Sequence, residues 1–386
     1  MAFWNRHNTT PLLLDLGTDG VKMMQAGRSG SNLRVVACGR RRFPDGMEGD
    51  SERQREFAAQ AIREMCRRDG FLGRTVISSL PCGPLGVKNI RLPQMPEHDT
   101  RRAVLEEANE RFGYSVVPDR LRWFVAGQVR QGNEVRNEVI MMAVSKEDLD
   151  AHMQLLSDAS LRPLHIDPEP IALFRAFTRF LKRQSDEQAV TVLVDLGRGS
   201  TRVVVARGQK VVFIKAIDIG GDRLTDAVAK QLSISNAEAA ELRLRIIRDS
   251  FECLRDDPAG QPKDRDNVQW TLHDALRGEV ESLAREVALC LRYCSVTFRG
   301  LRPKQVVLLG GEAYDPAIRA LLGENLGIEC VVGQPLRGLD LSGVEFQTDR
   351  RATLAEWTVC AGMSLRHPAI SHPPKGGAHA GHRLSA

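Results

Sequence analysis

The sequence predicts an α/β protein of two related lobes, each of which begins with a β-hairpin closed by an Asp-Leu-Gly turn. One copy of this turn is Asp15-Leu16-Gly17 and the other is Asp195-Leu196-Gly197, 180 residues later. Each copy follows an apolar run, and a third strand and then helices come after each hairpin. Within the first half, residues 84–165 have a different pattern, with short strands and charged helices. Two related halves predict two loops that reach one shared ligand.

The composition is that of a globular chain large enough for two cores. Its 386 residues are 42% hydrophobic and 27% charged, and both fractions are ordinary for soluble proteins. No apolar run is long enough to span a bilayer, and Met1–Thr10 lacks the apolar core of a signal peptide. We therefore predict a cytoplasmic protein.

The eight cysteines and the net charge of +5 indicate no further site. Cys290 and Cys294 share a helix face and offer two metal ligands, but no second pair lies at a closing spacing, which favours small core residues. The arginine run Arg40-Arg41-Arg42 has no interleaved aromatic residues, which favours a solvated face over nucleic-acid binding. Attraction to an anionic membrane surface is the alternative for such runs.

The first half is predicted to have the order β-β-β-α-β. Its hairpin covers residues 12–26 and its third strand residues 32–43. Ser51 is the predicted cap of a helix with an apolar face at helical spacing, and Gly70 ends that helix. Arg74–Leu80 is the next strand. These elements, with residues 1–83 and 166–184, form the predicted first lobe.

Residues 84–165 are predicted to form an inserted α/β subdomain. Its expected elements are a strand over Val87–Leu92, a helix over Asp99–Arg111, and paired strands over Leu121–Val129 and Glu138–Val144. Ser145-Lys146-Glu147-Asp148 is a capping box for a helix through Ser157. The chain then returns to the first lobe, with a helix over Ile171–Lys182.

Residues 185–366 are predicted to repeat the first half as a second lobe. Strands are expected over 190–194, 201–206, 211–217 and 306–309, and helices over 222–232, 235–247, 272–298 and 317–326; Thr353–Leu365 is expected to close the core. The charged stretch Asp249–Asp266 is predicted to be irregular. Residues 367–386 are predicted to be a disordered tail, and loose metal binding by its four histidines is the alternative.

Residues suited to anion binding gather at the two turns. No Gly-x-x-x-x-Gly-Lys-Ser/Thr run is present, which excludes a P-loop. Glycines let both turns approach an anion closely and hydroxyl side chains add donors; these residues are Gly17, Thr18, Gly20, Gly197, Gly199, Ser200 and Thr201. Asp15 and Asp195 would face each other and repel unless a cation lies between them. Magnesium held mostly through water suits that place.

Two Gly-Gly pairs extend the pattern. Gly310-Gly311 at a strand end admits the flat face of a base and its ribose, and Gly220-Gly221 begins a helix whose N-terminus can donate to phosphate. Each pair alone is more often a bend or a helix cap. The joint order is more specific: loop, insertion, loop, Gly-Gly, long helix, Gly-Gly.

This order resembles the actin-like ATPase superfamily, and within it the PilM family of type IV pilus assembly proteins, from Leu12 to about Leu365. Asp15 to Lys22 looks like the family's phosphate-one loop, Asp195 to Thr201 like its phosphate-two loop, and Leu309-Gly310-Gly311 like its adenosine loop. Gly220 to Thr225, followed by Asn236 to Glu241, is similar to its Gly-Gly, Leu-Thr and Glu-Ala-Glu pattern. The cell-division protein FtsA shares the placement of the extra subdomain.

The resemblance implies a bilobed actin-like (ribonuclease H-like) fold that binds ATP with magnesium. The implied nucleotide ligands are Asp15, Gly17, Thr18, Asp19, Gly20, Lys22, Asp195, Gly197, Arg198, Gly199, Ser200, Thr201, Gly220, Gly221, Glu241, Gly310 and Gly311, with Asp15 and Asp195 toward magnesium. The family commonly has a small hydroxyl residue in place of Asp19, whose charge Arg198 could offset. Hydrolysis of ATP needs a base positioned to activate water, and the sequence does not distinguish between Glu238, Glu241 and Glu312 for that role. We therefore expect at most slow ATP hydrolysis.

The resemblance also implies a cytoplasmic adaptor that reaches the inner membrane only through partners. Its insertion would bind the cytoplasmic tail of an inner-membrane PilN-like protein and join a pilus or type II secretion-like motor to the envelope. The predicted groove residues are Val87, Leu92, Trp123 and Phe124. Two alternatives stay open: a small-molecule kinase on the same fold, with Asp167 as its base, and an FtsA-like division or filament protein, which would favour an amphipathic C-terminal helix.

Overall fold

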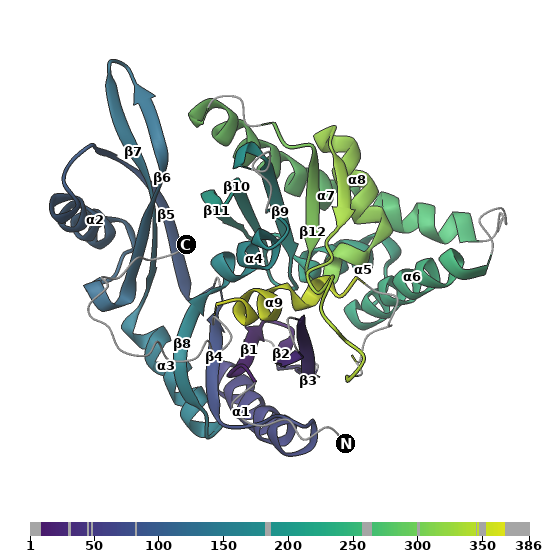
Figure 1. The fold of residues 1–386 in the computed structure, drawn as a ribbon. Helices are drawn as coiled ribbons and strands as arrows, with labels where there is room; N and C mark the ends of the chain where they lie inside the picture. The colour runs from purple at the N-terminus through teal and green to yellow at the C-terminus, as the bar shows by residue number, and fades with distance from the viewer. Residues whose placement is uncertain are drawn as a thin grey trace.

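A computed structural model of the chain shows two lobes built on matching five-stranded sheets (Figure 1). It describes residues 9–366 except 30–31, 45, 48, 82, 182–186, 257–264, 299–301, 345 and 347–352. The strand order is β3-β2-β1-β4-β8 in the first sheet and β11-β10-β9-β12-β13 in the second. Each order is an antiparallel hairpin and third strand on one side and parallel strands on the other. The predicted relation between the halves is therefore confirmed at the level of topology.

The first lobe begins with an antiparallel meander and ends with parallel strands. Its elements are β1 (Leu12–Gly17), β2 (Gly20–Ser29), β3 (Asn32–Arg42), α1 (Ser51–Arg68), β4 (Thr75–Leu80), β8 (Arg162–Pro168) and α4 (Glu169–Thr178). The cap of α1 is Asp50 and not the predicted Ser51, because the Asp50 carboxylate accepts from the Arg53 backbone N–H at 3.0 Å. The buried face of α1, with Ile62 and Met65, covers this sheet.

The insertion is a three-stranded antiparallel sheet with one covering helix. Its elements are β5 (Leu85–Pro93), α2 (Glu97–Arg111), β6 (Leu121–Gln131) and β7 (Glu134–Val144), and the strand order is β5-β7-β6. Helix α2 packs on one face through Val104 and Ala108. In Figure 1 the β6–β7 hairpin projects away from the body of the molecule.

The other face of the insertion packs on the second lobe. Ile140 and Met142 lie in the same apolar cluster as Ile214 of the second-lobe edge strand. A buried polar junction stands beside it: the Glu138 carboxylate accepts from Arg91 Nε at 2.9 Å and from the Tyr293 hydroxyl of the second lobe. The insertion is thus attached to both lobes.

The insertion ends earlier than predicted. Helix α3 (Lys146–Asp158) begins at the predicted Ser145 cap, whose Oγ accepts from the Asp148 backbone N–H at 3.0 Å. Its buried Leu155 and Leu156 join the core of the first lobe together with α1. The chain has therefore returned to that lobe by Lys146 and not at residue 165, because the apolar face of α3 is buried there.

The second lobe carries longer helices than predicted. Its elements are β9 (Val190–Leu196), β10 (Thr201–Arg207), β11 (Lys210–Ile217), α5 (Gly221–Leu232), α6 (Asn236–Asp256), α7 (Arg265–Thr297), β12 (Gln305–Leu309), α8 (Pro316–Leu326), β13 (Glu329–Val332) and α9 (Thr358–Ser364). Helices α6 and α7 extend into the stretch predicted to be irregular, and β13 was not predicted. The predicted tail, residues 367–386, lies outside the described residues.

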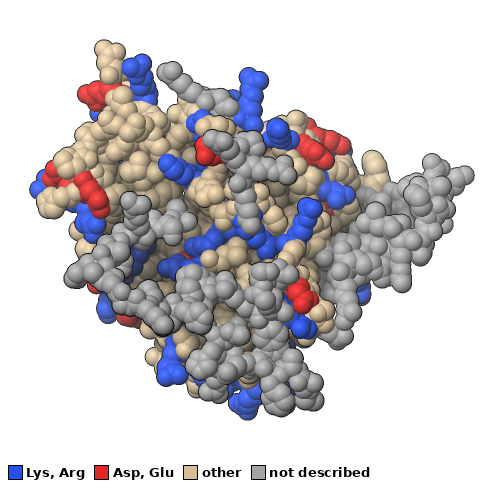
Figure 2. All heavy atoms as spheres, viewed as in Figure 1, with Lys and Arg blue, Asp and Glu red and all other residues tan. Residues whose placement is uncertain are grey.

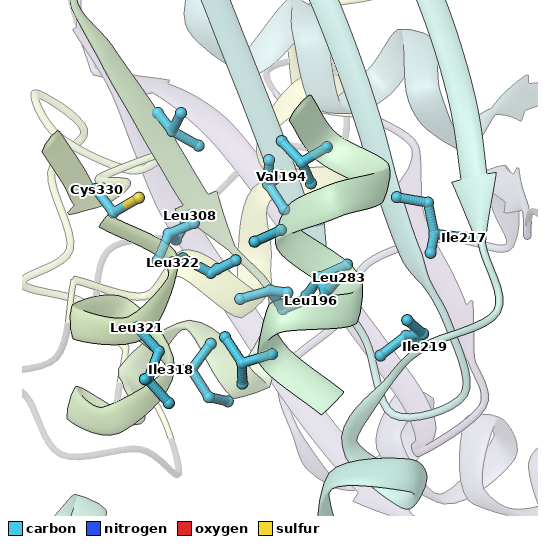
Figure 3. Packing of buried hydrophobic residues seen from close by; sticks show 14 of the residues in the cluster. Val194, Leu196, Ile217, Ile219, Leu283, Leu308, Ile318, Leu321, Leu322 and Cys330 are labelled. Atoms are coloured by element: carbon cyan, nitrogen blue, oxygen red, sulfur yellow. The ribbon is translucent and has the colours of Figure 1, made fainter. Parts of the chain in front are cut away.

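The main core of the second lobe forms where α7 lies on the sheet (Figure 3). Leu283 of α7 lies among Val194, Leu196, Leu308 and Leu322. The cysteines of α7, Cys290 and Cys294, are buried in this core, as the apolar interpretation predicts.

Helices α4 and α9 pack closely between the two sheets. A Cβ at Gly362 of α9 would lie 1.7 Å from the Ala172 carbonyl oxygen of α4, so only glycine permits this approach. Buried residues of both helices, such as Phe174 and Cys360, join strands of both lobes in one cluster. This pair of helices therefore connects the lobes. No helix among the described residues has both the length and the apolar character required to cross a bilayer.

Candidate functional site

The two predicted turns meet in space although 180 residues separate them. The backbone N–H of Gly199 donates to Thr18 Oγ1 at 3.2 Å. A Cβ at Gly199 would lie 3.3 Å from the Thr18 methyl group, so the turns are in van der Waals contact. Glycine at this position keeps the approach possible. The predicted convergence of the two loops is therefore present.

Asp15 lies in β1 two residues before its end, in a buried position, and is already paired. Lys22 lies opposite it in the β1–β2 register, and Lys22 Nζ is 2.9 Å from Asp15 Oδ2. Ser79 Oγ of β4 donates to the other oxygen, Oδ1, at 3.0 Å. Burial opposes the charged form of Lys22, but the Asp15 carboxylate outweighs it and raises the pKa of Lys22.

Asp195 has the matching arrangement in the second lobe. Arg202 lies opposite it in the β9–β10 register, and Arg202 Nη1 is 3.3 Å from Asp195 Oδ2. The same guanidinium reaches the first residue of α4, with Nε 3.2 Å from Glu169 Oε2. Burial raises the pKa of Asp195, with a further contribution from Asp15, and Arg202 and Lys22 only partly oppose that rise.

The magnesium prediction assumed that the charges of Asp15 and Asp195 repel each other unless a cation lies between them. Each aspartate is bonded to a cation of its own hairpin, Lys22 or Arg202. Within the described ranges, no cluster of three or more His, Cys, Asp and Glu side chains is placed to hold a metal ion. Asp15 and Asp195 therefore each have a cationic partner in the protein, and magnesium held between them mostly through water stays a prediction.

Asp19, which departs from the family pattern, is also neutralised. Its carboxylate contacts Arg40 of β3, and Arg42 Nε lies 3.5 Å away. Burial would raise the pKa of Asp19, but these arginines outweigh it and lower that pKa. Arg198 does not offset Asp19 as predicted, since its Nε is 2.8 Å from Asp222 Oδ1. Cationic side chains of the strand next to the turn therefore balance this charge.

The N-terminus of α5 supports the second turn instead of presenting its first amides to a ligand. The backbone N–H of Gly221 donates to the Gly197 carbonyl at 3.0 Å, and that of Asp222 donates to the Arg198 carbonyl at 2.9 Å. A Cβ at Gly220 would lie 2.4 Å from the Arg198 carbonyl oxygen. The N–H of the predicted phosphate donor Gly221 is thus taken by the turn, which packs directly on the helix, and Gly220 permits that close approach.

The predicted adenosine loop lies against the second turn. Gly310 has φ +82°, and a Cβ there would be 2.3 Å from the Leu196 carbonyl oxygen. Next to it, Glu312 is paired with Arg243 of α6, which also reaches Asp315 Oδ2 at 3.2 Å. Burial opposes the charge of Arg243, but the two carboxylates outweigh it and raise its pKa. This loop is therefore fixed to α6 by a buried ion-pair cluster.

The three candidate bases have separate positions. Glu238 caps α6, since its Oε2 accepts from the Ser235 backbone N–H at 2.9 Å. Glu241 is exposed on the same helix, and Glu312 is paired with Arg243. Both Glu238 and Glu312 are thus engaged elsewhere in the protein.

The predicted groove residues lie on opposite faces of the insertion sheet. Leu92 and Trp123 face α2 and belong to the core of the insertion, whereas Val87 and Phe124 face the second lobe. The prediction of one groove from these four side chains is therefore wrong, because alternate strand residues point to opposite faces.

The sequence did not predict the ion pairs made by three buried charged residues: Glu169, Arg202 and Arg243. The sequence holds a signal for Arg202, since Lys22 follows Asp15 by seven residues and Arg202 follows Asp195 by seven.

Figure 2 shows basic side chains across the middle of one face of the molecule, with acidic ones nearer its rim.

Comparison with known proteins gives a family and a fold. The family model described as type IV pilus assembly protein PilM matches residues 14–368. A solved structure of a PilM-PilN type IV pilus biogenesis complex is similar at a TM-score of 0.72 and 22% identity, over 92% of this chain and 98% of that one. The ethanolamine utilization protein EutJ from Carboxydothermus hydrogenoformans is similar at a TM-score of 0.52 and 14% identity, over 92% and 89%. The fold is thus the bilobed actin-like fold.

Proposed function

The chain belongs to the family of the type IV pilus assembly protein PilM, and on that premise we propose that it is an adaptor that binds ATP between its lobes and a PilN-like protein through its insertion. The proposal of ATP binding rests on the contact between the two turns, in which the Gly199 N–H donates to Thr18 Oγ1 at 3.2 Å. Two glycine-rich turns that meet at the ends of strands can surround a triphosphate from both sides.

The proposed phosphate contacts come from the two turns and from Lys22. Among the amides of the turns, the Gly199 N–H reaches the other lobe at Thr18, whereas the Gly197 N–H is bonded within its own turn to the Ser200 carbonyl at 3.1 Å. The Lys22 ammonium, paired with Asp15, would add a cation beside the phosphates. The Gly310-Gly311 loop would receive the base and ribose, since it lies against the second turn. Glu241 is not part of this proposal, since it is exposed on α6. Magnesium would arrive with the phosphates and be held mostly through water, with Asp15 and Asp195 toward it.

The proposal of a PilN-like partner rests on the family and on the insertion. In the similar solved complex a PilM protein is assembled with PilN. Given the packing of α3, we place the insertion at residues 84–144, the first lobe at 1–83 and 145–184, and the second at 185–366. Through a PilN-like tail the protein would sit at the cytoplasmic face of the inner membrane and connect a pilus motor, or a related secretion motor, to the envelope.

The kinase alternative lacks its base. Asp167 is fully buried and its carboxylate is paired with Arg175 and Arg366. A carboxylate with two arginine partners is poorly placed to take a proton from a substrate hydroxyl. The helix expected of an FtsA-like protein would fall in the tail, outside the described residues.

Calorimetric titration with ATP tests the proposed binding of ATP. The wild type is expected to bind, and Gly310→Val is expected to lose binding while its circular dichroism spectrum stays native, because the new side chain collides with the Leu196 carbonyl. Gly278→Val, at a glycine of α7 with nothing near its Cβ position, is the matched control and should bind as the wild type does. Absence of wild-type binding would reject the proposal.

A peptide titration tests the proposed binding of a PilN-like protein. A synthetic peptide of the N-terminal cytoplasmic tail of a PilN-like protein from the same genome should bind the full chain. A scrambled peptide of the same composition is the control. Equal binding of both peptides would contradict a specific adaptor.

A further inference from the structure

The C-terminal part of α7 carries an exposed face of mixed basic and apolar side chains, and we propose that this face binds the surface of an anionic lipid bilayer. The inference goes beyond the proposed function, in which a protein tail alone holds the chain at the membrane. One step of it, the place of this face beside the partner site, rests on that proposed function.

The apolar part of the face consists of Leu289 and Val296. Their side chains are 52% and 75% exposed, and Val296 is the most exposed large hydrophobic side chain in the described part of the chain. The two residues are seven apart, about two turns of helix, so they project from the same side of α7. The opposite side, with Val287 and Cys294, is buried in the core of the second lobe. Two large apolar side chains thus project together into solvent.

Basic side chains alternate with these apolar ones. Arg285 lies four residues before Leu289, and Arg292 lies between Leu289 and Val296, so all four share one helix face. Both arginines are exposed, and among the described residues neither has a carboxylate partner. Arg285 Nη2 donates instead to the neutral Ser282 Oγ at 2.8 Å. The positive charge of this face is therefore not balanced within the protein.

The basic character continues beyond the helix. Residues 285–305 contain five Lys and Arg side chains and one carboxylate, Glu286, which is paired with Lys215 at 2.7 Å. Arg302 and Lys304 are exposed and likewise have no carboxylate partner within the described ranges. Several cations that surround projecting apolar side chains complement a layer of anionic headgroups above acyl chains.

Other occupants fit this face less well. A nucleic acid would use the cations through its phosphates but would leave the apolar side chains in water. A second copy of the chain that packed the same face against itself would bring arginine against arginine. An acidic protein would satisfy both kinds of side chain, and its distinction from a bilayer depends on where the face lies.

The face adjoins the insertion. Thr297 Oγ1, at the end of α7, lies 3.2 Å from Arg91 Nη2 of β5, and a Cβ at Gly127 of β6 would lie 2.8 Å from the ring of Phe298. The end of α7 is thus beside the insertion sheet, whose β6–β7 hairpin projects in Figure 1. Because the insertion is the proposed site for the tail of a membrane protein, binding of that tail would bring this end of α7 toward the bilayer. This position favours lipid over a soluble acidic protein.

Co-sedimentation of the full chain with vesicles is the deciding experiment, without any PilN-like peptide. One set of vesicles contains about 30% phosphatidylglycerol in phosphatidylcholine, and the other contains phosphatidylcholine alone. At about 0.1 M salt we expect partitioning at least about tenfold stronger onto the anionic vesicles, and weaker at about 0.5 M because salt screens the charges. Equal partitioning onto both sets, or none, would overturn the inference and leave the face to an acidic protein. The peptide titration decides the proposed partner separately, so the two failures are distinguishable.

A charge-reversal variant locates the binding surface. Arg285→Glu with Arg292→Glu should weaken partitioning onto the anionic vesicles at least about tenfold. Arg245→Glu with Arg248→Glu makes the same change in net charge on an exposed part of α6 and is the matched control, expected within about twofold of the wild type. Equal losses in the two variants would show that binding follows net charge and not this face.

An apolar variant separates a bilayer from a purely ionic surface. Leu289→Gln with Val296→Gln keeps every charge and should weaken partitioning about threefold or more, because these side chains would enter the headgroup layer. Leu244→Gln, at an exposed apolar residue of α6, is its control and should bind as the wild type does. Circular dichroism checks that each variant is folded. Full partitioning of the folded α7 double variant would contradict contact of this apolar pair with lipid.

Discussion

In the first lobe the turn after Asp15 is held largely by side chains, whereas in the second lobe the turn after Asp195 is held largely by backbone hydrogen bonds. Asp19 of the first turn is bound by the arginines of β3. The carbonyls of Gly197 and Arg198 in the second turn are bound by the first amides of α5. One sequence pattern therefore has two kinds of support, and substitutions should affect the two lobes differently.

The cations beneath the turns differ in the same way. Lys22 has one ion-pair partner in its own hairpin and is partly exposed, while Asp15 keeps a second hydrogen bond from Ser79. Arg202 is more deeply buried and joins Asp195 to Glu169 at the start of α4. Arg202 thus serves two buried carboxylates of the second lobe at once, whereas Asp15 of the first lobe is held by both Lys22 and Ser79.

Removal of the two cations should show the largest contrast. Arg202→Met leaves two buried carboxylates without this partner and is expected to lower the free energy of unfolding by about 3–5 kcal/mol. Lys22→Met leaves Asp15 with Ser79 and is expected to cost about 1–2 kcal/mol. Urea unfolding at pH 7 measures both. Equal losses would contradict the contrast between the lobes.

Crowding the contact between α5 and the second turn should have the next largest effect. Gly220→Ala places a Cβ 2.4 Å from the Arg198 carbonyl oxygen, and the free energy of unfolding is expected to fall by about 2–3 kcal/mol. Gly278→Ala, at an open site within α7, is the control and should gain about 0.5–1 kcal/mol. A neutral Gly220→Ala would show that the second turn does not depend on its approach to α5.

Acid should weaken the first lobe through His152. This side chain of α3 is buried beside Ser78, with Nε2 2.8 Å from Ser78 Oγ, and burial lowers its pKa from 6.5 to about 4. Below pH 6.5 the unfolded chain binds a proton that the folded chain refuses, so stability falls as the pH drops from 6.5 toward 4. The expected loss is about 2 kcal/mol.

The free energy of unfolding of the wild type and of His152→Asn is measured between pH 7 and pH 4.5. The difference between the two proteins at each pH gives the contribution of His152. The difference should shrink as the pH falls. His98→Asn, at an exposed histidine of α2, is the control and should leave the pH dependence unchanged. A constant difference between the wild type and His152→Asn would contradict the assigned burial effect.

The contact between the turns should have the smallest effect. Thr18→Val removes the acceptor for the Gly199 N–H and is expected to cost about 1 kcal/mol. Thr18→Ser keeps the hydroxyl and should cost less. Thermal unfolding compares the two variants with the wild type. Equal melting temperatures for Val and Ser would mean that the hydroxyl does not link the lobes.

The sheets could be predicted because their signals are local. Apolar β-branched runs and the Asp-Leu-Gly turns lie within a few residues of each other, and the repeat places both hairpins. The ends of α6 and α7 could not be predicted because charged residues such as those after Asp249 carry no apolar periodicity. The short strand Glu329–Val332 gives too little pattern to detect.

The site could be predicted only as far as the turns. The loops from Asp15 and Asp195 follow from the sequence, but the partner of each aspartate depends on strand register. The pairing of Arg243 with Glu312 joins residues 69 positions apart, which no local pattern shows. The groove failed for a similar reason, since the face of each insertion residue is set by packing on α2 and on the second lobe.

The junction of Glu138, Arg91 and Tyr293 connects the insertion to the second lobe and can transmit force between them. A membrane-anchored partner that pulled on the insertion would load the first lobe through the chain and the second lobe through this junction, where Arg91 Nη2 also lies 3.2 Å from Thr297 Oγ1 at the end of α7. Tension would thus be divided between the two halves that meet at the turns. A rotation of one half against the other would, in return, tilt the projecting hairpin.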